Sequence, residues 1–345
     1  MKSYRNFPST LSQISRVIYE NLSRLSRSFL HLDFVEARSI IEKKDHSMRE
    51  KLTTLEQAAK LVKDGDSVAI GGIMYSRTPM GMIREIVMSG VKGLTVSRLL
   101  FSFESDLMFV AGSVSAAVTS WISMGVTWGV SKVMRHYAEH GIVKIEEWSH
   151  SALNLRYKAA ALGVPFLPTL SMLGSDLMKH TSVKEMDCPF TGKKLCLVPA
   201  LFPDVAIIHV QRADKYGNAQ VDGMPFADAD MARGAGKVII TTEEIVSSDR
   251  IRRESDRTLI PFFCVDAVVE APFGSYPHEC PGLYHADYEF FHKYADLVNE
   301  KGVDGVKQYL NDYIFDTPSY YDYLQKFHVS NLLKNVALRR ELMNE

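Results

Sequence analysis

Residues 64–79, from which the fold can be read, are Asp-Gly-Asp-Ser-Val-Ala-Ile-Gly-Gly-Ile-Met-Tyr-Ser-Arg-Thr-Pro. The pair Asp64-Gly65 is a turn signal, and it introduces a short β-prone run from Ser67 to Ile70. Gly71 and Gly72 end that run. Because glycine tolerates positive φ and lets a ligand or another backbone approach closely, the pair predicts more than a simple chain reversal.

A helix is expected directly after the glycine pair. Pro79 is preorganised for a first helical turn, and Met80 to Val87 continue the helix. The amide groups of that helix start point toward the carboxyl end of the preceding strand, where open α/β sheets bind ligands. The stretch therefore predicts a strand, a glycine turn and a helix that together suit an anionic ligand.

Strand-like runs alternate with helical or loop segments from Thr53 to about Glu270. This alternation predicts an α/β fold with an open, mainly parallel sheet layered with helices. The run Val205-Ala-Ile-Ile-His-Val is apolar without alternation, which indicates a strand buried on both faces. The other expected strands are Leu94 to Leu99, Ala116 to Trp121, Ile145 to Trp148, Pro165 to Ser171, Lys194 to Pro199 and Val238 to Thr242.

The composition is that of an ordinary soluble protein. Of 345 residues, 46% are hydrophobic, enough for one large or two modest cores, and a formal charge of −1 argues against a polyanion-binding surface. No apolar run approaches the roughly 20 residues that span a bilayer. The cysteines show no C-x-x-C pair and no regular spacing, so neither a metal site nor disulfides are indicated, and a cytoplasmic location suits them: Cys188, Cys196, Cys264 and Cys280.

Changes in composition divide the chain into three parts. Residues 1–47 are rich in serine and arginine with apolar residues at helical spacing, and we interpret them as an accessory N-terminal extension outside the fold, or the result of a misplaced start codon, ahead of a targeting signal. Residues 48–275 are expected to form the α/β domain, beginning with a helix capped by Thr53 and Glu56. Residues 276–345, rich in aromatic residues, read as a helical tail packed on that domain.

The stretch that opens at Asp64 resembles the signature of the alpha (A) subunit of family I coenzyme A transferases. That signature runs Asp-Gly, two free positions, three apolar residues, Gly-Gly-Phe and, a few residues later, Gly-x-Pro. Ile73 stands where the pattern has phenylalanine, and Arg77 stands where it usually has glycine. An arginine at this position resembles the glutaconate CoA-transferase branch of the family, so this departure narrows the resemblance to that branch. The matching residues are Asp64, Gly65, Val68, Ala69, Ile70, Gly71, Gly72 and Pro79.

Further blocks extend the resemblance to the A subunit of glutaconate CoA-transferase over nearly the whole chain after Met48. They are Ala159 to Pro168, Gly174 to Asp176, Cys188 to Gly192, Asp204 to Asn218, Val265 to Gly274, Pro277 to Tyr284 and Tyr313 to Asp316. Because so many blocks occur in order, the chain is identified as a member of this subunit family. The resemblance implies the family I CoA-transferase fold, with a helical C-terminal tail, and a heteromeric enzyme.

The resemblance also implies a reaction. In this family a glutamate attacks the acyl-CoA thioester to give an acyl-glutamyl anhydride, coenzyme A thiolate then forms a glutamyl thioester, and an incoming carboxylate takes over the coenzyme A. In two-chain members this glutamate belongs to the beta (B) subunit, usually within Ser-Glu-Asn-Gly, a tetrapeptide that this chain lacks. We therefore expect a B-subunit partner in equal number, and coenzyme A or acyl-CoA as a substrate rather than a permanently bound cofactor.

Glu104 is the nearest superficial candidate for a nucleophile in this chain. No glycine adjoins it to let a thioester approach, so we interpret it as a surface or capping carboxylate. The chain is instead expected to stabilise an oxyanion and to bind a carboxylate. Amides near Gly71 and Gly72 are the candidate oxyanion donors.

Arg77, beside Ser76, is the candidate clamp for the second carboxyl group of a dicarboxylic acid. A guanidinium offers a planar fork that matches a carboxylate. A solvated arginine and an intersubunit ion pair are the alternatives. Ser76 is included among the substrate-binding candidates with Gly71, Gly72 and Arg77.

Residues after later strand-like runs give further candidates. Gly174 and Ser175 follow Pro165 to Ser171, and they either contact the acyl-CoA or close a loop. Gln211 follows the strand that begins near Asp204, at the edge where parallel sheets bind ligands. All three are taken as candidate substrate-binding residues.

Two histidines are read differently. His150 stands where a strand-like stretch gives way to a helix. Similar proteins of this fold that open carbocyclic CoA esters carry an acidic base near this position, so the resemblance implies that histidine is a departure from the ring-opening pattern. A histidine here can still orient an acyl group or move a proton, which makes His150 a candidate auxiliary catalytic residue; a capping or interface histidine is the alternative. His209 lies in an apolar strand and reads as a hydrogen-bonded core histidine.

Three functions stay open from the sequence. The favoured one is the A subunit of a CoA-transferase that acts on a glutaconate-like dicarboxylate. The second is a subunit of a partner-dependent acyl-CoA lyase, decarboxylase or hydrolase of the same fold, and the third is a non-catalytic scaffold subunit. The sequence does not identify the acid.

Overall fold

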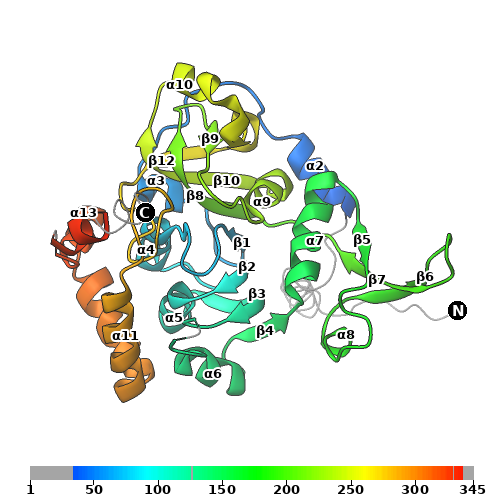
Figure 1. Cartoon of the computed structure of the whole chain (residues 1–345), viewed down its shortest axis with the longest axis horizontal. Coiled ribbons are helices and arrows are strands. Elements are labelled where there is room, and N and C mark those ends of the chain that lie inside the picture. The colour runs from blue at the N-terminus through cyan, green and yellow to red at the C-terminus, as the bar shows by residue number, and fades with distance from the viewer. Residues whose placement is uncertain (1–33, 126, 329, 337–345) are drawn as a thin grey trace, which may run out of the picture.

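The computed structural model describes residues 34–125, 127–328 and 330–336, and its centre is a mainly parallel sheet of nine strands (Figure 1). The strand order is β11-β9-β8-β1-β2-β3-β4, and β10 pairs with both β8 and β12. The strands are β1 (Ser67–Ile70), β2 (Leu94–Phe101), β3 (Val114–Ile122), β4 (Lys144–Glu147), β8 (Val205–Ala213), β9 (Ala219–Gln220), β10 (Lys237–Ile245), β11 (Thr258–Ile260) and β12 (Ala267–Glu270).

Helices cover both faces of this sheet. One apolar cluster contains residues of the helices between residues 55 and 139 together with the C-terminal helices, and another contains residues of the helices at 150–162 and 228–234. The strand β8 lies between them, and its residues 205–211 are all buried, as its continuous apolar run predicts. The helices are α2 (Phe34–Glu42), α3 (Leu55–Ala59), α4 (Met80–Ser89), α5 (Phe103–Val110), α6 (Lys132–Glu139), α7 (His150–Leu162), α8 (Leu177–His180), α9 (Asp228–Gly234), α10 (Ser248–Arg253), α11 (Tyr288–Lys301), α12 (Val303–Tyr309) and α13 (Tyr320–Gln325).

The predicted α/β fold class is confirmed, and so are most strand positions. β1 has the predicted bounds, and α4 begins at Met80 after Pro79 as expected. The expected capping pair at the domain start is wrong by one residue. Thr54 is the N-cap of α3 and accepts a hydrogen bond from the Gln57 amide. A capping box at Thr53 would need the Thr53 amide as a donor to Glu56, but that amide donates to Val268 O.

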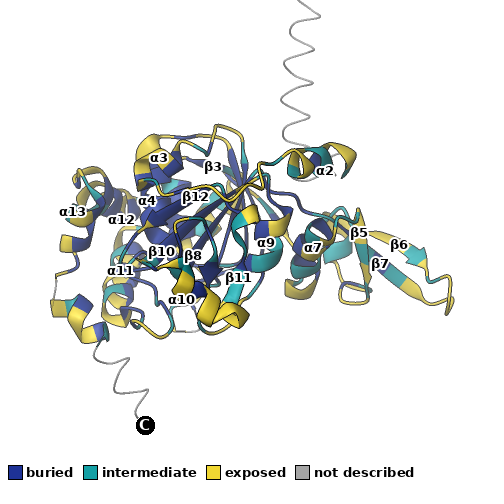
Figure 2. Cartoon of the chain, turned by 90° about the horizontal axis from the view of Figure 1, so that it is seen from above, coloured by how far each residue is buried: buried dark blue, intermediate teal, exposed yellow. Residues whose placement is uncertain are grey.

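Two predicted strands do not belong to the parallel sheet. Residues 164–200, which we call the arm, contain a separate antiparallel sheet in the order β5-β7-β6, together with the short helix α8. Figures 1 and 2 show the arm extending away from the main sheet beside α7. Periodicity predicts a strand but not its pairing partner, which is why the assignment of these runs to the main sheet is wrong. The arm strands are β5 (Phe166–Thr169), β6 (Lys184–Asp187) and β7 (Lys194–Pro199).

The aromatic C-terminal segment packs on α5. The ring of Phe103 meets those of Tyr294, Tyr309 and Phe290 at centroid distances of 4.6, 5.2 and 5.4 Å in edge-on geometry. Between α12 and α13, residues Leu310–Phe315 form a π-helical turn. Aromatic side chains therefore hold the helical tail against the sheet domain.

Part of the predicted N-terminal extension contacts the α/β fold. In α2, Ala37 lies in a small apolar cluster with Ala160 and Phe202. Lys44 Nζ forms an ion pair with Asp266 at 2.8 Å. The interpretation of residues 1–33 lies outside the described residues. Across the described part of the chain, no helix combines the length and apolarity needed to cross a bilayer.

Candidate functional site

The glycine pair that ends β1 is held by two internal hydrogen bonds. The Gly71 amide donates to Ile207 O at 2.8 Å, which continues the β1–β8 pairing. The Gly72 amide donates to Asp228 Oδ1 at 2.8 Å. Gly72 has φ +65°, and a Cβ at this position would lie 2.2 Å from Ser76 O. Glycine is thus required here by both conformation and space.

Asp228 supplies the anion at the turn that was predicted to suit an anionic ligand. It is the first residue of α9 and fully buried, and its second carboxylate oxygen forms an ion pair with Arg77. The same guanidinium donates to His209 O at 3.2 Å and to Met224 O at 2.7 Å. The anion beside the glycine pair is therefore a carboxylate of this chain.

This geometry changes the interpretation of Arg77. Its side chain has no exposed surface, and the alternatives of a solvated arginine and an intersubunit pair do not apply, since its partner lies in the same chain. Arg77 also has φ +54°, an uncommon conformation for a residue with a side chain. The residue ties the β1–α4 loop to α9 and to β8. A substrate carboxylate would have to displace Asp228 to reach it.

Ser76 lies in the same loop and is buried. It forms an isolated bridge with Glu279, and the next amide, that of Arg77, donates to Glu279 O at 2.9 Å. Ser76 O accepts from the Ile73 amide at 3.0 Å. The loop is thus closed on itself and fastened to the segment after β12, so Gly71, Gly72, Ser76 and Arg77 lie together but face inward.

Gln211 is also engaged within the chain. Its amide nitrogen donates to Asp222 O at 3.1 Å and to Pro281 O at 2.8 Å, while its oxygen accepts from the Asp222 amide at 3.1 Å. These bonds use both N–H groups and one acceptor of a buried side chain. The residue joins two loops, which is a structural role rather than the predicted contact with substrate.

Gly174 and Ser175 lie in the arm, on a different element from the β1–α4 loop. Ser175 is exposed, and its hydroxyl donates to Met172 O at 2.8 Å. Gly174 has φ +75°, and a Cβ added at this position would meet only open space, so the turn conformation alone accounts for the glycine. The loop-closing alternative describes this pair.

His150 lies where β4 gives way to α7, as predicted, and so at the carboxyl edge of the sheet. It is the first residue of α7, which Ser149 caps by accepting from the Ala152 amide at 3.1 Å. His150 Nδ1 lies 3.1 Å from Ser120 Oγ, and the Ser120 hydroxyl donates to Leu99 O at 2.6 Å. Because the single hydroxyl hydrogen goes to Leu99, Nδ1 must carry the proton and donate to Ser120. Nε2 is then left with a lone pair.

Partial burial lowers the pKa of His150 below its ordinary value, because desolvation disfavours the imidazolium. The neutral tautomer with a free Nε2 lone pair is thus favoured near neutral pH. At the N-terminus of a helix this ring can accept a proton or a hydrogen bond from a ligand. His150 is therefore the one candidate among those predicted that offers an open acceptor at the carboxyl edge of the described sheet.

Glu104 is buried, so the prediction of a surface carboxylate is wrong, while its capping role is confirmed. It accepts from the Ser102 amide at 2.9 Å at the start of α5 and forms an ion pair with Arg98. Its other oxygen lies 3.7 Å from Nε2 of His278, and burial holds the pKa of His278 well below its ordinary value. With no exposed surface, Glu104 is closed to a thioester.

His209 is a hydrogen-bonded core histidine, as predicted. Nδ1 lies 2.9 Å from Thr241 Oγ1, and Nε2 lies 2.7 Å from Glu243 Oε1. His209, Glu243 and Cys280 present ligand atoms within 4.8 Å of one another, a spacing that suits a metal ion. Glu243 already accepts from the amides of Phe273 and Gly274, and burial raises the pKa of the Cys280 thiol well above its usual range, so this group is a hydrogen-bonded network with no open ligand position.

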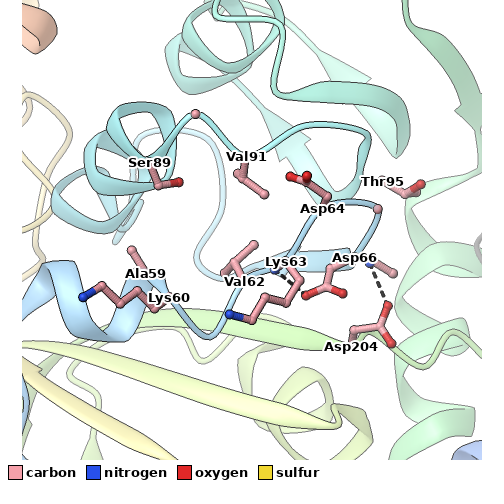
Figure 3. Close-up of a pocket in the computed structure, with 13 residues that line it drawn as sticks. Ala59, Lys60, Val62, Lys63, Asp64, Asp66, Ser89, Val91, Thr95 and Asp204 are labelled. Atoms are coloured by element: carbon pink, nitrogen blue, oxygen red, sulfur yellow. Dashed lines mark hydrogen bonds between the residues drawn. The ribbon is translucent and has the colours of Figure 1, made fainter.

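A cavity lies at the opposite edge of the sheet. Its volume is about 680 Å³, and it is lined by the segments that precede β1, β2 and β8 (Figure 3). Asp204 in its wall accepts a hydrogen bond from the Ser67 amide at 2.8 Å. Because ligands of open α/β sheets bind at the carboxyl ends of strands, this cavity is not the candidate site.

Two residues that shape the site were missed in the sequence. Asp228 stands at a helix start after the turn pair Asp222-Gly223, where an aspartate reads as an ordinary helix-terminal acid. Ser120 lies inside a strand-like run, and nothing local connects it with His150, which is 30 residues further along. Both act through tertiary contacts that carry no local signal.

Three comparisons bear on this geometry. Residues 52–271 match the family model described as "Coenzyme A transferase". The chain is 34% identical to the A subunit of glutaconate CoA-transferase from Acidaminococcus fermentans over 301 residues, which cover 82% of this chain and 93% of that one. The crystal structure of that enzyme superposes with a TM-score of 0.78 over 82% of this chain and 94% of that chain.

Two other relatives differ in activity. The chain is 32% identical to the A subunit of 3-oxoadipate CoA-transferase from Pseudomonas knackmussii over 81% of this chain and 98% of that one. A crystal structure of the decarboxylase AibA/AibB has a TM-score of 0.68 and 28% identity over 76% of this chain and all of that chain. The same architecture thus occurs in transferases and in a decarboxylase.

Proposed function

This chain is a member of the coenzyme A transferase family, an A subunit of family I, and we propose that with a B subunit it moves coenzyme A between an acyl-CoA and a dicarboxylic acid. The single observation that carries the proposal is the similarity to the A subunit of glutaconate CoA-transferase over 93% of that protein's length. In this proposal the nucleophilic glutamate belongs to the B subunit, since the chain has no Ser-Glu-Asn-Gly and Glu104 is enclosed.

In the proposed reaction the acyl group is held at the carboxyl edge of the sheet around His150. A nucleophilic glutamate needs its acyl group held and a partner that can receive a proton or a hydrogen bond. His150 begins α7 at this edge, and the contact of its Nδ1 with the Ser120 hydroxyl fixes the ring and leaves the Nε2 lone pair unused. The β1–α4 loop follows the carboxyl end of another strand of the same sheet, and Asp228 and Arg77 fix its conformation.

A dicarboxylate is favoured by the names of two relatives rather than by Arg77. Glutaconate and 3-oxoadipate, named in those two transferases, are both dicarboxylic acids. Since Asp228 already neutralises Arg77, the proposal assigns the second carboxylate of the substrate to another cation, contributed by this chain's edge or by the B subunit.

The alternative is a decarboxylase or hydrolase subunit of the same architecture. His150 supports it, because a neutral imidazole with an open Nε2 can act as a general base for water or for a carbon acid without a covalent intermediate. The similarity to the decarboxylase AibA/AibB fits this second function. It differs from transfer by the absence of a glutamyl thioester.

The two functions are separated by trapping the intermediate. The chain would be coexpressed with its B subunit, incubated with a series of acyl-CoA esters, and treated with borohydride, which reduces a glutamyl thioester. Transfer predicts a reduced glutamate on the B subunit, found by mass spectrometry, and exchange of labelled coenzyme A into added dicarboxylate. An active complex with no modified glutamate would establish the decarboxylase or hydrolase function instead.

A further inference from the structure

The arm carries an apolar sheet face. In the β5-β7-β6 sheet, Leu197 stands opposite both Pro168 and Lys184, and Leu195 stands opposite Met186. Directly opposed residues of antiparallel strands point to the same face, and neighbours along a strand alternate. We call the face formed by these residues the outer face: Phe166, Pro168, Met186, Leu195 and Leu197, with Lys184 at its border.

The two faces of this sheet have different surroundings. On the inner face, Cys196 and Val198 are fully buried in the apolar cluster that includes α7, with Met178 of α8 packed against it. The outer-face side chains belong to none of the apolar clusters formed by the described residues, and 41% of the surface of Phe166 is exposed. Figure 2 shows intermediate and exposed residues along the arm.

Phe190 adds an exposed apolar side chain at the tip of the arm. Its surface is 94% exposed, and it stands in the turn between β6 and β7. Two bonds of 2.8 Å close that turn, from the Cys188 amide to Lys193 O and from the Gly192 amide to Cys188 O. An aromatic side chain on an ordered turn next to an apolar face has the character of an interface anchor.

The strand edges of the arm are unsuited to pairing with another strand. Pro168 removes an amide from the β5 edge, and β6 carries charged side chains at Lys184, Glu185 and Asp187. Charge and proline on an edge oppose strand addition. A partner would therefore pack on the outer face rather than extend the sheet.

We propose that the outer face and Phe190 bind the B subunit, an inference that rests on the proposed function for the existence of that subunit. The arm is continuous with the candidate site, because Ser171 Oγ lies 3.2 Å from Ser149 Oγ, and Ser149 caps the helix that begins with His150. A B subunit that delivers a glutamate to His150 must reach this edge and so meets the root of the arm.

Charge favours the B subunit over two other occupants. The charged residue at the outer face is Lys184, and the face carries no acid, so two copies packed through this same face would leave Lys184 without a counter-ion. Residues 1–33 are basic, with Glu20 the only acid before Asp33, so they bring the same sign of charge. The occupant inferred here is a B-subunit surface that is apolar with an acidic residue opposite Lys184.

The test measures binding of the full chain to its B subunit by titration, together with hydrogen exchange of the arm. Phe190→Ala and Leu195→Glu are expected to weaken the complex at least about tenfold each, as loss of an interface anchor does. The matched control, Glu185→Lys, lies on the other face of β6 and is expected to leave the affinity unchanged. Amides of residues 184–198 are expected to gain protection only when the B subunit is added.

The outcomes are distinguishable. The inference is overturned if both variants bind the B subunit with unchanged affinity, or if the arm amides gain no protection in the complex. If Leu195→Glu does not fold, the affinity of Phe190→Ala alone decides the test. If the arm amides of the chain without its B subunit become more protected from exchange as the concentration of the chain rises, the outer face binds a second copy. If their protection is lost when residues 1–33 are deleted, the outer face binds that segment. Either result overturns the inference. Borohydride trapping is scored separately, so a complex that binds through the arm yet forms no glutamyl thioester refutes only the proposed transfer.

Discussion

The replacement Asp228→Ala tests the central contact of the β1–α4 loop. The change leaves the Arg77 guanidinium buried without its counter-ion and leaves the Gly72 amide without an acceptor. Breaking a buried ion pair by removing one partner costs about 3–5 kcal/mol. An orphaned buried amide costs about 1–3 kcal/mol, and because both losses share one cavity they do not add fully. We expect a net loss of about 4 kcal/mol in the free energy of unfolding.

The assay is urea-induced unfolding of the full chain at constant pH and salt, followed by circular dichroism. Asp228→Asn keeps an oxygen for the Gly72 amide, so its smaller cost isolates the loss of charge. Asp230→Ala, on the same helix but partly exposed, is the matched control and is expected to change stability by less than about 0.5 kcal/mol. The double variant Arg77→Met/Asp228→Leu removes both charges and is expected to cost less than either single removal of charge.

The result that would refute this reasoning is a cost for Asp228→Ala below about 1 kcal/mol, or equal to that of Asp230→Ala. Such a result would mean that water or a rearranged side chain satisfies Arg77. If Asp228→Ala also bound dicarboxylates more tightly than the unmodified chain, Arg77 would regain the clamp role that the sequence suggested.

Three further predictions concern other contacts. His150→Ala in the complex with the B subunit should lower kcat/KM by about 100-fold or more while assembly persists, because the Nε2 acceptor is lost; His140→Ala, exposed at the end of α6, is the control, and equal activity of the two variants argues against a catalytic His150. Gly72→Ala should cost about 2 kcal/mol more than Gly174→Ala in thermal or urea unfolding, since both have positive φ but only Gly72 lacks room for a Cβ; equal costs would show that conformation alone matters. Burial raises the pKa of Asp106 to about 7 from an ordinary value of 3.8. The stability that the protonated Asp106 carboxyl group contributes is therefore full below pH 4 and is lost as pH rises through 7. Between pH 5 and pH 8 the free energy of unfolding of Asp106→Asn should rise by about 2.5 kcal/mol relative to that of the unmodified chain, whereas the exposed Asp296→Asn should show no such trend.

Local sequence patterns predicted the strands and helices because the bounds of each one depend on residues next to it in the chain. The bounds of β1 follow from a turn pair before it and two glycines after it, and the start of α4 follows from Pro79. The burial of β8 follows from its unbroken apolar run. The arm was misassigned to the main sheet because a short apolar run is equally consistent with either sheet.

Site residues were predicted less well because their roles depend on distant partners. His150 was found because it stands between a strand-like run and a helix, near the position where similar proteins of this fold carry a base. Gln211 lies close to that edge too, yet its amide is used by Asp222 and Pro281, and the second of these is 70 residues away. No local pattern distinguishes a polar side chain that is free from one that is already paired.

The sequence by itself determined that residues 64–79 form a strand, a turn that only glycine permits, and a helix start able to receive an anion. Those properties are local, since they depend on φ at Gly72 and on the order of turn, apolar and helix-starting residues. Tertiary structure alone decided which anion occupies the turn. Asp228 reaches the Gly72 amide from 156 residues away, and burial makes its pairing with Arg77 more favourable than leaving either charge alone, so the loop supports the candidate site from within while His150 lies at its open edge.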